Sequence, residues 1–160
     1  MNKIIASIFG IGYIKGGGTI AAAVTCVVIW LLWAKGVSPY LFLAEGLAVT
    51  LIGVYVGNKV ERFWGKDSYR VVIDEVAGMW ISVLFLPQTL PVLITGLILF
   101  RFFDIVKPLY IRKMEDFKGG WGVMLDDVLA GIYANIILQA IVYLHLLPFT
   151  GGGALDIHFR

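Results

Sequence analysis

The stretch VLAGIYANIILQAIVYLHLL, residues 128–147, decides the fold class. It contains twenty residues, and its polar members are Asn135, Gln139 and His145. A transmembrane helix needs about 20 consecutive, predominantly apolar residues. Residues 128–147 are therefore predicted to cross a membrane as one helix.

Four more stretches have the same apolar character, at residues 19–34, 39–57, 71–86 and 90–106. The 160 residues are 59% hydrophobic and 15% charged, whereas soluble domains are roughly 45–50% apolar and about 25% charged. This composition excludes a disordered chain and argues against a soluble globule. We expect an all-α fold, a polytopic membrane helical bundle of about five spans, in a single integral membrane domain over residues 1–160.

The basic residues predict how the bundle is oriented. Ten of the thirteen precede the first span or lie between the second and third or the fourth and fifth: Lys3, Lys15, Lys59, Arg62, Lys66, Arg70, Lys107, Arg112, Lys113 and Lys118. Cytoplasmic loops collect Lys and Arg. A multi-pass membrane protein with a cytoplasmic N-terminus is expected. Residues 110–121 alternate charged and apolar side chains, which predicts an interfacial amphipathic segment.

Acidic residues gather at the same face. Six are predicted at the cytoplasmic ends of three spans: Asp67, Asp74, Glu75, Asp104, Asp126 and Asp127. A carboxylate costs about 2.5–3.5 kcal/mol at the centre of a membrane helix and less near its ends, so such residues usually serve function. Converging carboxylates suit a hard divalent cation. We expect Mg²⁺ to be held by Asp74, Glu75, Asp126 and Asp127.

Glycines are predicted to bring two of these spans together. Asp74 and Asp127 each begin the pattern Asp-x-x-Ala-Gly, which places Gly78 and Gly131 one helical turn beyond them. Small residues allow membrane helices to approach closely. The carboxylates of spans three and five should therefore lie near each other.

Two features indicate phosphate binding. Arg101, Asp104 and Lys107 are spaced by three and share a helix face, which suits either a phosphate grip or a structural ladder of ion pairs. The glycines before Thr19 leave backbone N–H groups at a helix N-terminus, where phosphate is favoured. A flexible linker explains the same glycines equally well.

Three strings resemble the phosphatidylglycerophosphatase A family in order and spacing. They are Val-Ile-Asp-Glu-Val-Ala-Gly-Met-Trp at 72–80, Phe-Arg-Phe-Phe-Asp-Ile-Val-Lys-Pro at 100–108, and Gly-Gly-Trp-Gly-Val-Met-Leu-Asp-Asp-Val-Leu-Ala-Gly at 119–131. The resemblance runs over about residues 9–133. The chain departs from the family pattern at Gly17-Gly18-Thr19, where the family usually has Pro-Gly-Thr, and at residues 66–69.

The resemblance implies a Mg²⁺-dependent phosphatase of phospholipid biosynthesis in a bacterial-type inner membrane, with its active site facing the cytoplasm. Such an enzyme converts phosphatidylglycerophosphate in the bilayer to phosphatidylglycerol and inorganic phosphate. The resemblance also implies that the six acidic residues above are catalytic and that Arg101, Lys107 and Thr19 bind the substrate phosphate. Either an activated water or an aspartyl-phosphate intermediate is compatible with these residues. A cation transporter or channel that uses the intramembrane carboxylates is the alternative. A net charge of +2 gives no indication of a nucleic-acid partner, and the metal number and oligomeric state are left open.

Overall fold

The structure, a computed structural model, describes residues 1–66 and 68–147. These residues form helices and no strands, which confirms the all-α class. The elements are α1 (Asn2–Ala6), the 3₁₀ helix η1 (Ile11–Tyr13), α2 (Gly17–Ala34), α3 (Pro39–Trp64), α4 (Ile73–Ser82), α5 (Leu90–Val106), α6 (Ile111–Met114) and α7 (Gly120–Tyr143).

Three of the described helices, α2, α3 and α7, are long and apolar enough to cross a membrane. Helix α5 has 17 residues and α4 has 10. At 1.5 Å per residue, α4 extends only about 15 Å, roughly half of the hydrocarbon core. The five predicted apolar stretches therefore correspond to three candidate spans and two shorter helices.

The observed bounds differ from the predicted ones at four stretches. The helix expected over 71–86 covers only Ile73–Ser82, because the chain turns at Phe85, whose backbone is left-handed (φ 58°), and then meets Pro87. Helices α2 and α3 extend the predictions 19–34 and 39–57 to Gly17 and Trp64, since glycines and charged side chains continue a helix beyond an apolar stretch. Only residues 90–106 match throughout.

Helix α7 begins at Gly120 and ends at Tyr143, instead of covering 128–147. Asp126 and Asp127 therefore lie nearly two turns inside the helix, and the prediction that they begin it is wrong. The amphipathic segment predicted over 110–121 is not one helix either. It consists of α6, a turn, and the first residues of α7, with left-handed Gly119 (φ 64°) at the junction.

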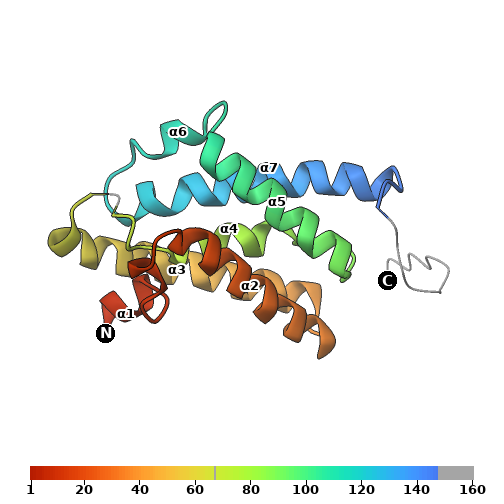
Figure 1. The fold of residues 1–160 in the computed structure, drawn as a ribbon, viewed down its shortest axis with the longest axis horizontal. Coiled ribbons are helices and arrows are strands. Elements are labelled where there is room, and N and C mark those ends of the chain that lie inside the picture. The colour runs from red at the N-terminus through yellow and green to blue at the C-terminus, as the bar shows by residue number, and fades with distance from the viewer. Residues whose placement is uncertain (67, 148–160) are drawn as a thin grey trace.

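Helix α4 lies inside the bundle, in contact with α2, α3, α5 and α7 (Figure 1). The Trp80 ring stacks on Phe42 at 4.8 Å between centroids, and its indole N–H donates to the Phe42 carbonyl at 2.9 Å. Gly78 and Gly131 face each other, since a Cβ on Gly131 would meet the backbone of Gly78. This confirms the predicted close approach of α4 and α7.

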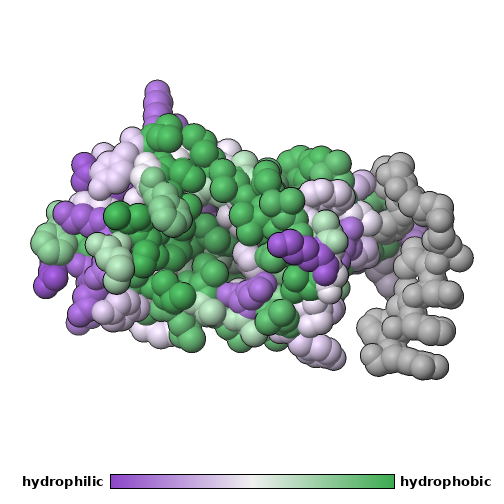
Figure 2. Space-filling model, turned by 90° about the horizontal axis from the view of Figure 1, so that it is seen from below, coloured by the Kyte–Doolittle hydropathy of each residue, from purple (hydrophilic) through white to green (hydrophobic). Residues whose placement is uncertain are grey.

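The outer faces of the long helices are hydrophobic. Leu31, Leu51, Ile98 and Ile136 are each more than half exposed. Figure 2 shows a hydrophobic band along the molecule, with hydrophilic residues gathered at the end where α1 and the C-terminal end of α3 lie. Such a band is what a bilayer covers.

Candidate active site

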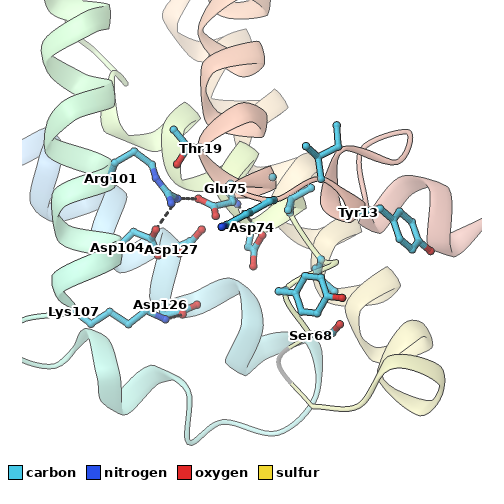
Figure 3. Close-up of a pocket in the computed structure, with 18 residues that line it drawn as sticks. Tyr13, Thr19, Ser68, Asp74, Glu75, Arg101, Asp104, Lys107, Asp126 and Asp127 are labelled. Carbon is cyan, nitrogen blue, oxygen red and sulfur yellow. Dashed lines mark hydrogen bonds and ion pairs between the residues drawn. The ribbon is translucent and has the colours of Figure 1, made fainter.

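The predicted site residues surround one pocket of about 670 Å³, a typical size for a ligand site. Its walls come from the segment before α2, the first turn of α2, residues 68–75, the C-terminal end of α5, and α7 (Figure 3). Thr19, Arg101 and Lys107 line it together with five of the six predicted carboxylates: Asp74, Glu75, Asp104, Asp126 and Asp127. Asp67 lies outside the described residues.

Helix α4 supplies two of these carboxylates from its first turn. The sequence permits a helix start here because negative side chains are favoured near the N-terminal end of the helix dipole. The Asp74 Oδ1 atom accepts a hydrogen bond of 2.9 Å from the Glu75 N–H. Asp74 and Glu75 are thus fixed at the point where α4 enters the pocket.

Arg101 connects α4 to α5. Its guanidinium donates to the Glu75 carboxylate, and it forms an ion pair of 2.6 Å with Asp104, three residues further along α5 (Figure 3). These side chains are only 12–17% exposed. A pair so shielded from water interacts more strongly than a surface pair. The spacing of Arg101 and Asp104 on one face is as predicted.

Lys107 connects α5 to α7. Its ammonium donates to Asp126 at 2.7 Å and to Glu115 at 2.6 Å. Burial lowers the pKa of Lys107, but the hydrogen bonds to these two carboxylates outweigh it and raise the pKa above the ordinary value. The side chain is therefore held as a cation. Its backbone is left-handed (φ 46°), which ends α5 and precedes Pro108.

Carboxylate oxygens of Glu75, Asp104 and Asp127 all lie within 4.8 Å of one another. Asp127 is only 3% exposed. Among the described residues these three form the one group whose geometry could hold a metal ion. Oxygen ligands of this kind suit Mg²⁺, which is commonly bound through one or two carboxylates together with substrate phosphate. The donor chemistry thus fits Mg²⁺, the cation that the sequence predicts. Of the four predicted ligands, Glu75 and Asp127 belong to this group, Asp74 does not, and Asp126 binds Lys107, while Asp104 joins the group.

The start of α2 closes the pocket from the opposite side. A Cβ on Gly18 would overlap the Glu75 carboxylate and come within 3.4 Å of the Arg101 Nη1 atom. Glycine at this position therefore lets the Glu75 and Arg101 side chains lie directly against α2. The first backbone N–H groups of a helix have no partner within it, so this end of α2 faces the carboxylate cluster with hydrogen-bond donors beside Thr19.

Sequence reasoning missed several residues at this site. Tyr13, Lys15 and Tyr69 line the pocket, and Figure 3 shows Tyr13 and Ser68 across it from Arg101. Glu115 was assigned to an interfacial helix, but it binds Lys107. The only available signal was opposite charge, because the turn after Lys107 is what brings Glu115 back.

Comparison with known proteins identifies this arrangement. The family described as phosphatidylglycerophosphatase A matches residues 4–142. A Bacteroides thetaiotaomicron protein named "Putative phosphatidylinositol-3-phosphatase" is 41% identical over 149 residues, covering 84% of this chain and 89% of that protein. No solved structure matches the chain.

Two further relatives carry the family's name. Phosphatidylglycerophosphatase A of Haemophilus influenzae is 35% identical and covers 88% of each chain. The Escherichia coli protein of the same name is 37% identical over 93 residues, which are 56% of this chain and 54% of that protein. The matches extend over nearly all the described helices, so this protein is a phosphatase that belongs to the phosphatidylglycerophosphatase A family.

Proposed function

We propose that the protein hydrolyses phosphatidylglycerophosphate to phosphatidylglycerol and inorganic phosphate at the cytoplasmic face of a bacterial-type inner membrane. The observation that carries this proposal is the pocket in which carboxylates of α4, α5 and α7 meet Arg101 and Lys107. The names of the Haemophilus influenzae and Escherichia coli relatives supply the substrate. The concentration of basic residues in the loops next to the pocket supports the cytoplasmic side.

The phosphate group would be held between α2 and α5. Arg101 already faces the pocket with a planar set of donors, and its Nε atom is buried without a hydrogen-bond partner in the described structure. The backbone N–H groups at the start of α2 and the Thr19 hydroxyl offer further donors. Donors fixed in this way stabilise the charge that develops on phosphate oxygens during transfer.

Hydrolysis breaks the bond between phosphorus and the lipid alcohol oxygen. Asp74 or Asp127 would act in one of two ways. It orients a water molecule whose oxygen joins phosphorus, or it attacks phosphorus itself and forms an aspartyl phosphate that water then cleaves. In the first route the lipid alcohol leaves with the proton that the attacking water gives up. In the second route it takes a proton from a protonated carboxyl group or from solvent, and the water that later cleaves the aspartyl phosphate returns one. Rapid quenching of the reaction with a substrate labelled in its phosphate group distinguishes the two routes, because only the second route leaves labelled phosphate on the protein.

Glu75, Asp104 and Asp127 would hold Mg²⁺, with Asp74 and Asp126 as neighbours. When bound, the ion would neutralise phosphate charge and lower the pKa of water. Arg101 touches both Glu75 and Asp104, so it would fix the orientation of two of these carboxylates whether or not the ion is present.

The two shorter helices would complete a membrane bundle of five segments. Helix α5 is only a few residues shorter than an average span, and spans of about 17 residues occur. Helix α4 contacts four other helices, and in the turns that follow it Val83 is buried whereas Phe85 is 55% exposed. Irregular backbone at membrane depth is tolerated where protein surrounds it.

A second substrate is phosphatidylinositol 3-phosphate, which the name of the Bacteroides thetaiotaomicron relative indicates. Both lipids present a phosphomonoester on a polyol headgroup, so the same carboxylates and Arg101 would serve either. Selection between them would fall to the outer wall of the pocket, where Tyr13, Lys15 and Tyr69 lie.

The test is phosphate release by the purified protein from each lipid in mixed micelles, with Mg²⁺ and after its removal by EDTA. We expect Mg²⁺-dependent release, abolished in Asp127→Asn and retained in Asp116→Asn, an exposed residue outside the pocket. Faster release from phosphatidylinositol 3-phosphate would select the second substrate. Absence of release from both lipids in folded protein would reject the proposal, and ion flux through the protein in vesicles would then favour the transporter alternative.

A further inference from the structure

A second cavity lies outside the charged pocket, between α2 and α5. It has a volume of about 220 Å³ and apolar walls, to which α2 contributes Cys26, Val27 and Trp30 and α5 contributes Leu90, Ile94 and Leu97. The side chains of Val27 and Ile94 are 61% and 50% exposed. The cavity is therefore an open groove on the face that the bilayer covers.

On α2, the groove continues the wall of the charged pocket. Thr19 lines the pocket, and Val27 and Trp30 line the groove. Residues 19, 23, 27 and 30 are spaced by four, four and three, so they share one helix face. All four are exposed, and the residue between Thr19 and Val27 on this face is the small Ala23. Nothing bulky on α2 interrupts the path from pocket to groove.

Helix α5 supplies the matching wall in the opposite direction. Arg101 lines the charged pocket, and Leu97, Ile94 and Leu90 line the groove. These residues precede Arg101 by four, seven and eleven positions, which again gives one helix face. The two helices are in contact with each other. Their charged ends meet at the pocket, and their apolar ends meet at the groove.

The length of this path matches one leaflet of a bilayer. Thr19 to Trp30 and Arg101 to Leu90 are both eleven residues, or about 16 Å along a helix. Half of a hydrocarbon core is about 15 Å. A lipid whose phosphate lies beside Thr19 and Arg101 would therefore have an acyl chain alongside both walls for the full depth of its leaflet.

We propose that the groove between α2 and α5 holds one acyl chain of the phospholipid substrate and guides the lipid sideways from the bilayer into the pocket. This rests on the proposed function, because it takes the phosphate pocket as the headgroup site. A hydrocarbon chain is the occupant that fits an apolar groove which opens to lipid and continues into a phosphate site. The groove would select for the presence of a chain, and the pocket would select the headgroup.

Kinetics of groove variants test the proposal. Val27→Trp and Ile94→Trp fill the groove, while Val28→Trp on α2 and Ile136→Trp on α7 place the same bulk on lipid-exposed positions that do not line it. Each is assayed on long-chain phosphatidylglycerophosphate in mixed micelles and on its water-soluble, deacylated headgroup. The groove variants should lose about tenfold or more in kcat/KM on the long-chain lipid, the equivalent of about two buried methylene groups, and nothing on the headgroup. The control variants should match wild type on both.

The opposite results overturn the proposal. These are groove variants that behave like the controls, or groove variants that lose activity equally on the lipid and on the deacylated headgroup.

Photocrosslinking measures lipid binding in the groove without requiring hydrolysis. The probes are phosphatidylglycerophosphate and phosphatidylcholine that carry the same diazirine acyl chain, with the labelled peptides located by mass spectrometry. We expect preferential labelling of the groove walls by the phosphatidylglycerophosphate probe, suppressed in Val27→Trp. Equal labelling by the two probes would reduce the groove to ordinary lipid contact and refute the proposal. If wild type hydrolyses neither substrate, the proposed function fails, and this labelling pattern still decides whether the groove binds the lipid.

Discussion

Replacement of Gly78 by alanine should damage the active site through packing alone. Gly78 lies in α4, one turn after Asp74, where α4 contacts α7. A Cβ at this position would lie 2.6 Å from the Phe100 Cζ atom and 2.7 Å from the Asp127 carbonyl oxygen. Phe100 is fully buried and the other obstacle is backbone, so neither can rotate away. The Asp127 carbonyl must retreat by about 0.7 Å to reach the 3.4 Å of ordinary contact.

This displacement acts directly on the carboxylates. Asp127 moves with α7, whereas Glu75 stays with α4, so the distance between their oxygens changes by several tenths of an ångström. A misplacement of about 1 Å can cost about 10²-fold in rate, and overpacking typically costs about 1–3 kcal/mol of stability. We expect Gly78→Ala to lower kcat by about 10- to 100-fold while most of the protein remains folded.

The assay is phosphate release from phosphatidylglycerophosphate, with thermal unfolding in detergent measured on the same preparations. Gly46→Ala is the matched control, because its Cβ would lie 2.9 Å from the Trp80 Cδ1 atom on another face of α4, with the next atoms at 3.6 Å. It should lose stability but keep its activity. The reasoning would be refuted by a Gly78→Ala protein with normal kcat, or by equal losses of activity in the two variants.

Arg101→Lys should reduce kcat/KM by about 10²-fold, the usual effect of removing one stabilising donor, because one ammonium group cannot replace a guanidinium that bridges Glu75 and Asp104. Initial rates against substrate concentration measure this effect, and a variant within threefold of wild type would contradict the prediction. Glu115→Gln should change kcat/KM by less than about fivefold, since partly exposed ion pairs contribute about 0–1 kcal/mol, whereas Lys107→Met should cost far more because it leaves a buried carboxylate without its cation. If the two substitutions reduced phosphate release equally, Lys107 would act only through its ion pair with Glu115 and not through Asp126.

Hydropathy predicted the helices that depend on apolar length alone. Residues 90–106 form α5 with the expected bounds. Hydropathy could not show that the apolar run 71–86 contains a helix of only ten residues, because the turn at Phe85 is as apolar as the helix before it. Hydropathy did not predict the start of α7 either. Gly120, Trp121 and Gly122 are residue types common in loops and at membrane interfaces, but here they form the first turn of the helix.

The site was predictable to the extent that it depends on helix periodicity. Spacing by three placed Arg101 beside Asp104, and the two Asp-x-x-Ala-Gly patterns placed Gly78 against α7. The pairing of Lys107 with Asp126 and Glu115 was not predictable, because it depends on the left-handed backbone that ends α5. Tertiary geometry, not sequence spacing, also grouped Asp104 with Glu75 and Asp127.

The charges around the pocket constrain the chemistry that it can perform. Its described lining has five carboxyl groups and three cations, Lys15, Arg101 and Lys107, so when the carboxyl groups are all ionised a phosphate group with two negative charges would enter a negative site. Repulsion at such short range in a partly dry pocket would oppose binding by several kcal/mol. Arg101 and Lys107 are already engaged with carboxylates, so only part of their positive charge is available to the substrate. A divalent cation supplied from solution removes both difficulties at once, and the acidic cluster is therefore easier to reconcile with a metal-dependent phosphatase than with phosphate binding by protein groups alone.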